Sequence, residues 1–115
     1  MVVETAGLSD AEVDAIFRAL ADTTRRDIVT RVIEREQSVS SLAAGYSMSF
    51  AAVQKHVAVL ARASLVTKSR SGREQIVRAN PASLERARAL LESYESLWRH
   101  RVAAMDAILA EDPEQ

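Results

Sequence analysis

The residues that could do chemistry gather in the stretch 37–73, which contains no Asp or Glu although the 115-residue chain has 16 of them. The basic residues of this stretch are Lys55, Arg62, Lys68, Arg70 and Arg73. A positive segment within a chain of net charge −1 is typical of a surface that binds a polyanion, because an acid facing phosphate would be repelled. On charge alone, a chance clearing of acids stays open as the alternative.

Part of this stretch has the period of a helix, capped by Ser49 and running from Phe50 to about Ala63. Its apolar positions are Val53, Val57 and Leu60. If that side is buried, the opposite side presents groups that can read DNA. Gln54 can make two hydrogen bonds to adenine, and Lys55 can donate to guanine or phosphate. Ala51 is small enough to let the helix approach and contact a thymine methyl group.

Other side chains of the stretch suit the DNA backbone. Ser47 and Ser49 stand where hydroxyls and free helix amides can hold a phosphate. We interpret His56 as a half-buried histidine bonded to backbone or phosphate, not as a catalytic group. The candidate DNA-binding residues are Ser47, Ser49, Ala51, Gln54, Lys55, His56, Arg70 and Arg73.

Features of an enzyme or a metal site are not evident in the sequence. It has no cysteine, two histidines and no Gly-rich phosphate loop, so we expect no catalysis and no cofactor. His100 with Asp106 or Glu92 is the nearest approach to a zinc site, which needs three or four ligands. Without cysteine, a redox sensor would have to use methionine.

The surrounding pattern predicts the elements that position these residues. Helices are expected from Ser9, which forms a capping box with Glu12, and from the cap region 22–24 to about residue 34. A short helix capped by Ser40 should end at Gly45, as a residue tolerant of left-handed backbone. Together with the helix that follows, it matches a helix-turn-helix.

After the helix that ends near Ala63, the spacing of apolar residues changes from that of a helix to that of β-strands. Residues 65–70 and 74–79 read as two strands joined by a turn at 71–73, and Asn80-Pro81 opens a helix to about Ala110. The order predicts a mainly α protein with a small β-hairpin, a winged helix-turn-helix over 9–110 with flexible tails at 1–8 and 111–115. No apolar run is long enough for a membrane span, and the acidic N-terminus is unlike a signal peptide, so we expect a cytoplasmic protein.

The last helix is longer than so small a domain can cover. Its apolar positions recur every three or four residues and reach Trp98 and Met105, near the far end. We expect a second copy to cover them, the alternative being a helix that packs within its own subunit and frays at its end.

Several motifs resemble the ArsR-type (arsenical-resistance repressor) transcriptional regulators. They are Ala19–Arg26 (ALADTTRR), Met48–Leu60 (MSFAAVQKHVAVL), Leu65-Val66, Gly72-Arg73 and Asn80-Pro81. The resemblance implies a homodimer joined through its first and last helices. It also implies a partly palindromic double-stranded DNA operator and repression relieved by a signal. The interface residues so implied are Phe17, Leu91, Tyr94, Trp98 and Met105.

The chain departs from this pattern at a few positions. Thr23 replaces a proline, and Gln54 replaces a common serine. Ser64 stands where glycine ends the recognition helix, which predicts a strained or differently shaped turn there. Metal-sensing relatives use cysteine pairs or Asp/His sets, so the sequence resembles the metal-independent members and leaves any small-molecule effector unidentified. The alternative function is a winged-helix module that binds other proteins.

Overall fold

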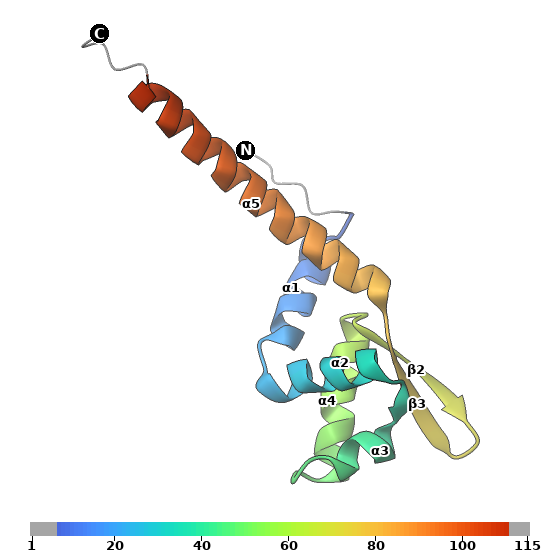
Figure 1. Cartoon of the computed structure of the whole chain (residues 1–115). Helices are drawn as coiled ribbons and strands as arrows, with labels where there is room; N and C mark the ends of the chain where they lie inside the picture. Colours follow the sequence, from blue (N-terminus) through green and yellow to red (C-terminus); the bar gives the residue numbers. More distant parts are fainter. Residues whose placement is uncertain (1–6, 111–115) are drawn as a thin grey trace.

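The computed structural model describes residues 7–110 and contains a helical body, a small sheet and one long projecting helix (Figure 1). The helices are α1 (Asp10–Leu20), α2 (Thr23–Glu34), α3 (Val39–Ala44), α4 (Phe50–Arg62) and α5 (Pro81–Ala110). The strands are β1 (Gln37–Ser38), β2 (Val66–Ser71) and β3 (Glu74–Ala79). Residues 1–6 and 111–115 of the predicted tails lie outside the described residues.

Local hydrogen bonds start the first helix where the sequence predicts. Ser9 Oγ accepts from the Glu12 amide at 3.1 Å, and the Ser9 amide donates to Glu12 Oε1 at 2.9 Å, forming the capping box. Leu8, which we predicted to lie in a flexible tail, is instead buried in the core with 6% exposure. It directly precedes the cap, where an apolar residue packs against the first turns of its helix.

The motif at 19–26 joins α1 to α2. Asp22 caps α2, because its Oδ2 accepts from the Arg25 amide at 3.0 Å. The Arg25 side chain donates to the carbonyl oxygens of Ala19 (2.7 Å) and Arg18 (3.0 Å), and Arg26 donates to that of Leu20 at 2.7 Å. The two arginines therefore bond carbonyls of the last turn of α1, of which that of Arg18 also accepts from the Ala21 amide at 3.3 Å.

The start of α3 differs from the prediction. Ser38, not Ser40, is the cap, and its Oγ accepts from the Ser41 amide at 3.0 Å. The start moves because Gln37 and Ser38 pair with Val77 and Ile76 of β3, which makes a third strand that the sequence pattern did not reveal. Gly45 ends the helix as expected, but its φ of −89° is an ordinary value, so the left-handed rationale was wrong.

The sheet has the order β1-β3-β2 and is antiparallel throughout. Strands β2 and β3 form the predicted hairpin, with Ser71 opposite Glu74 and a two-residue turn at Gly72-Arg73. Gly72 has φ of 62°, which suits the first turn position of a type II′ hairpin, where glycine is favoured. This hairpin is the wing.

A single core holds the body together. The largest fully buried side chains include Ile16, Ile28, Leu42, Val53, Val57, Leu60, Leu65 and Val77, drawn from every helix of the body and from the sheet. Ile33 of α2 is 57% exposed, although Ile28, Val29 and Val32 before it are buried, so the buried stripe of this helix ends at Val32.

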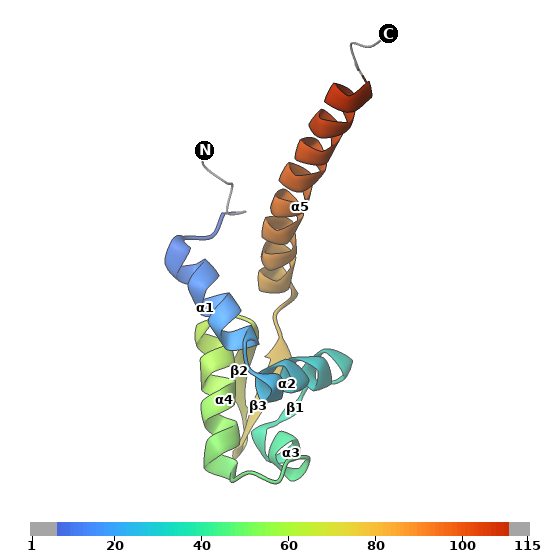
Figure 2. The same ribbon diagram turned by 90° about the vertical axis from the view of Figure 1, so that its left-hand side faces the viewer.

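Only the beginning of α5 packs against the body, through Ser83, Ala87 and Leu90. Figure 2 shows the rest of the helix leaving the other elements behind, which gives the structure its longest dimension of 75 Å. Within residues 7–110, the helices lack an apolar run long enough to cross a membrane.

The joint between α4 and the wing is strained, as expected. Ser64 has φ of 60°, a left-handed value that costs a residue with a Cβ atom energy. The value is imposed by the helix ending, because the Ser64 amide donates to the Ala61 carbonyl (2.9 Å) and the Leu65 amide to the Leu60 carbonyl (3.0 Å). This pair of bonds is the Schellman motif, in which glycine is the preferred residue.

We therefore expect Ser64→Gly to stabilise the protein. Relief of the left-handed strain, worth about 1 kcal/mol, is partly offset by the freedom that glycine gains in the unfolded chain, so the Tm should rise by about 3 °C. Ser40→Gly, at an exposed helical position, is the control and should lower the Tm. Calorimetry measures both. A lower Tm for Ser64→Gly would contradict the assignment of strain to this position.

Candidate nucleic-acid interface

Helix α4 is held to the core along one side and is open on the other. Val53, Val57 and Leu60 are 0–1% exposed, as the sequence predicts. On the far side Ala51, Gln54 and Lys55 are all exposed. Ser49 Oγ caps the helix by accepting from the Ala52 amide at 3.1 Å, so it lies at the helix start together with exposed Ser47. These five predicted residues are therefore brought together on one surface.

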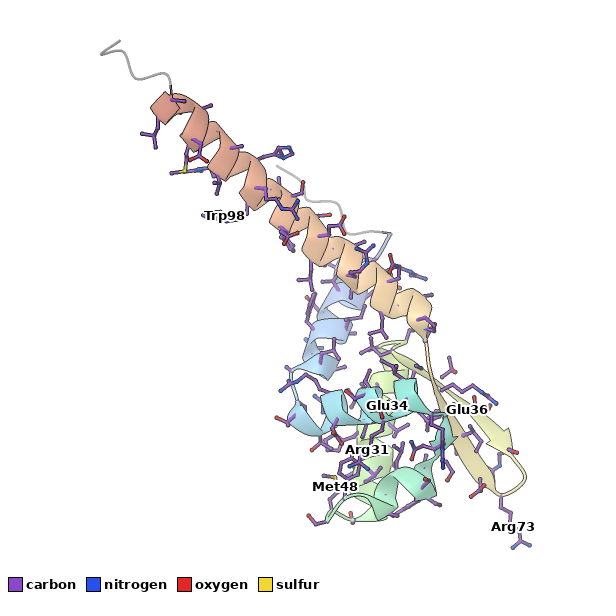
Figure 3. All side chains as sticks on the ribbon, viewed as in Figure 1. Arg31, Glu34, Glu36, Met48, Arg73 and Trp98 are labelled. Atoms are coloured by element: carbon purple, nitrogen blue, oxygen red, sulfur yellow. The ribbon has the colours of Figure 1, made fainter. Side chains whose placement is uncertain are left out.

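The turn that leads into α4 is fastened to α2 by three side chains, which we call the turn clamp: Asp27, Arg31 and Tyr46. The Tyr46 hydroxyl donates to Asp27 Oδ2 at 2.5 Å, and Arg31 Nε donates to the same oxygen at 2.8 Å. The Arg31 guanidinium also lies over the Tyr46 ring, 4.6 Å from its centroid, in a cation–π contact. Figure 3 shows Arg31 on the side of α2 that faces the turn, near Met48.

The shifts in the pKa values of Asp27 and Tyr46 agree with this geometry. The hydrogen bond from Tyr46, and then that from Arg31, hold the pKa of Asp27 below its ordinary value of 3.8 despite some burial. Burial, and then the bond to Asp27, raise the pKa of Tyr46 to about 12. At neutral pH the carboxylate is therefore charged and the hydroxyl is able to donate.

Gly45 is needed beside the turn clamp for space. A Cβ atom there would lie 2.2 Å from Arg31 Nη1, closer than atoms can approach. A larger residue would displace the end of the Arg31 side chain from the turn clamp, and this close approach, not backbone freedom, favours glycine here. No local pattern signals the turn clamp, because Tyr46 lies 19 positions from Asp27 along the chain.

His56 does not join the outward group of α4. Its ring is half-buried, with Nδ1 3.4 Å from Arg25 Nη1 and 3.9 Å from Asp22 Oδ2. It therefore contacts side chains at the start of α2, whereas we expected a bond to backbone or phosphate. A contact between His56 and phosphate stays a prediction.

The pleat of the wing decides which of its side chains face α4. Val66 and Val77 are buried, and side chains two positions apart in a strand share a face. The register places Arg70 opposite Gln75 on this same inner face. Arg73 projects at the tip, clear of the body (Figure 3). The outer face instead carries Arg78, whose Nε donates to Glu36 Oε2 at 2.6 Å.

A groove runs between α3, the start of α4 and the wing. It is lined by Val39, Ser40, Phe50, Gln54, Arg70, Arg73, Glu74 and Gln75. The groove thus unites Gln54 with both predicted wing arginines. Arg62 does not belong to it, because this arginine lines cavities beside α1 at the other end of α4.

Of the groove residues that sequence reasoning did not name as candidates, Phe50 and Glu74 bear most on its chemistry. Phe50 is a large apolar side chain with 47% exposure, and we had treated it only as the first residue of its helix. Glu74 is the first acid after the cleared stretch, and the hairpin turn brings it back to the groove. The acid-free character therefore holds along the sequence but not over the whole lining.

A second surface extends along α5. Leu91, Tyr94, Trp98 and Met105 are 50–64% exposed, and Phe17 of α1 is 38% exposed. Val102, Ile108 and Leu109 continue the same apolar exposure toward the helix end. Trp98 lies on the part of α5 that projects from the body (Figure 3). Such a stripe is larger than the isolated apolar residues of an ordinary surface.

The residues described, 7–110, contain no group of three or more His, Cys, Asp or Glu side chains placed to hold a metal ion. The metal-independent assignment stays a prediction.

Comparisons with known proteins agree on the kind of protein. No protein-family model matches the chain. It is 35% identical over 81 residues to the HTH-type transcriptional regulator Rv2034 of Mycobacterium tuberculosis, which covers 70% of this chain and 76% of that relative. The solved structure of an ArsR-like transcriptional regulator from Rhodococcus sp. RHA1 has a TM-score of 0.76 and 38% identity, covering 85% of this chain and 92% of the other.

A further structure agrees in fold. It is the homodimeric winged helix-turn-helix DNA-binding domain (fragment 1–100) of Mb0332 from Mycobacterium bovis, a possible ArsR-family transcriptional regulator. The TM-score is 0.60 at 24% identity, covering 82% of this chain and 91% of the other. These likenesses confirm the predicted winged helix-turn-helix.

The turn clamp leads to a prediction about local stability. Tyr46→Phe removes one hydrogen bond to a carboxylate, worth about 1 kcal/mol where solvent is near, so amides of residues 47–52 should exchange about fivefold faster. Hydrogen exchange measured by NMR checks this. Thr30→Val, which removes a hydroxyl that donates to the Arg26 carbonyl on the same helix, should leave those amides unchanged. Equal exchange in Tyr46→Phe and the wild type would mean that the turn holds its position without the clamp.

Proposed function

We propose that this chain, which belongs to the ArsR family of winged helix-turn-helix transcriptional regulators, is a homodimeric repressor that binds a specific, partly palindromic DNA operator. The observation that carries the proposal is the groove that joins Gln54 of α4 to Arg70 and Arg73 of the wing. An amide side chain can both donate to and accept from base edges, and two arginines can bind phosphates. Specific binding to a DNA duplex needs both kinds of contact side by side.

The proposed contacts follow from the shape of the surface. The exposed side of α4 enters the major groove, where Gln54 reads adenine, Lys55 binds guanine or phosphate, and Ala51 permits close approach. Ser47 and Ser49, with the free amides at the start of α4, hold one phosphate. Arg70 and Arg73 contact the flanking backbone or minor groove.

Dimerisation gives the operator its symmetry. In this proposal the apolar stripe of α5 and Phe17 of α1 pack against a second copy, which places two α4 helices one turn of DNA apart. Binding in the cytoplasm at a promoter then excludes the transcription machinery. We propose no catalysis, metal or cofactor for this activity, and residues 9–110 as the domain that carries it out.

The DNA-binding proposal is tested with duplexes that the protein itself selects from a random pool. Binding should weaken steeply with salt, because each phosphate contact contributes about 0.9 to the slope of log Kd against log salt. Lys55→Glu combined with Arg73→Glu should abolish binding at physiological salt, and in low salt it should lower the slope by about four, two contacts for each protomer. Fluorescence anisotropy measures both quantities.

The control for this double variant is Arg35→Glu with Arg86→Glu, which changes the net charge equally at positions outside α4 and the wing. It should keep most of the affinity. If both double variants lose binding equally, general charge and not the groove carries the attraction. If the wild type selects no sequence, the winged-helix protein–protein module becomes the better proposal.

The dimer is tested separately by Trp98→Asp. A charge at the centre of the apolar stripe should raise the dimer dissociation constant by about tenfold or more, because buried tryptophans dominate such interfaces. The subunit should still fold, since Trp98 is 64% exposed within one chain. Ser96→Asp, on the opposite side of α5, is the control. Sedimentation equilibrium that finds Trp98→Asp fully dimeric would place the interface elsewhere.

A further inference from the structure

Phe50 is an exposed residue on a side of α4 whose other apolar residues are buried. It precedes Val53 by three residues and Val57 by seven, so the helical period puts it on the buried side of α4. Both valines are at most 1% exposed, whereas Phe50 is 47% exposed. The reason is its place at the first turn of the helix, where the core has ended and the groove begins.

The surroundings of Phe50 tell what kind of surface covers it. Gln54, one helical turn further along α4, lines the same groove, as do Arg70 and Gln75 from the inner face of the wing. Two amides and a cation around an apolar ring do not suit an apolar protein surface, which would leave their hydrogen bonds unmade. They suit a partner with hydrogen-bonding edges, negative charge and a small apolar group.

We propose that Phe50 reads thymine, through contact between its ring and the 5-methyl group in the major groove. Thymine is the DNA base that carries an apolar group on its major-groove edge, and phenylalanine is among the residues that contact it. Phe50 and Gln54 are four residues apart, about 6 Å along the helix axis, so the thymine lies one or two base pairs from the pair read by Gln54.

The charged residues of the groove separate two kinds of contact. Arg70 and Arg73 come from the wing and suit phosphates. Glu74 also lines the groove from the wing, and a phosphate beside it would be repelled. In this proposal the phosphates therefore lie against the two arginines, and a base edge lies against Phe50 of α4. In this proposal the groove selects the DNA sequence as well as binding the phosphate backbone.

This inference rests on the proposed DNA-binding function, so the experiment separates the two. The wild type first selects a duplex from a random pool, and each thymine in that duplex is then replaced, one symmetric pair at a time, by deoxyuridine, which lacks only the methyl group. At one pair of positions the wild-type affinity should fall by about fourfold for each half-site, the effect of one buried methyl group. At that pair Phe50→Ala should bind the thymine and deoxyuridine duplexes equally, and Phe50→Leu should keep most of the preference.

Two neighbouring variants serve as controls. Gln54→Ala should lose preference at its own base pair but keep the methyl preference at the Phe50 position. Ala51→Gly tests the other residue of α4 that could contact a methyl group. If Ala51→Gly removes the discrimination and Phe50→Ala keeps it, the assignment to Phe50 is overturned.

The remaining outcomes are also decisive. A wild type that binds its selected duplex but is indifferent to every deoxyuridine replacement refutes the reading of thymine while leaving the proposed function intact. A wild type that selects no duplex refutes sequence-specific binding itself, and the thymine inference with it. The deoxyuridine series on the wild type needs no variant to fold, so the first of these results is independent of any effect of Phe50→Ala on stability.

Discussion

The burial of one side of α4 is the constraint on which the rest of the structure depends. Val53, Val57 and Leu60 fill the centre of the core, so the helix cannot rotate without exposing them to water. This fixes Ala51, Gln54 and Lys55 on the opposite side. The same anchoring explains Phe50, because the stripe continues past the point where the core ends and leaves an aromatic ring at the mouth of the groove.

The core fixes the rotation of α4 about its axis, and polar contacts fix the positions of its two ends. The turn clamp fastens the turn before α4 to α2 through a carboxylate that accepts from both Tyr46 and Arg31. At the other end, the side-chain amide of Asn80 donates to the Ser64 carbonyl oxygen at 2.8 Å. The backbone amide of Asn80 donates to the Leu65 carbonyl oxygen at 3.0 Å. Both ends of α4 are thus tied to neighbouring elements.

These ties connect the two surfaces of the protein. Asn80 directly precedes α5, so the residue that secures the end of α4 lies next to the start of the helix that carries the apolar stripe. The strained joint at Ser64, the end of the wing and the start of α5 therefore meet around this one residue.

The sequence by itself determined the elements with strong local signals. These are the capping box of Ser9 and Glu12, the buried stripe of α4, the hairpin with Gly72 in its turn, and the long helix after Pro81, because caps, periods and turns act over a few residues. Only the tertiary structure decided features that depend on distant partners. Pairing with β3 moved the cap of α3 to Ser38, packing of Arg31 explained Gly45, and the end of the core left Phe50 exposed. A local pattern states which side of an element is apolar, but whether anything covers that side is decided by the rest of the chain.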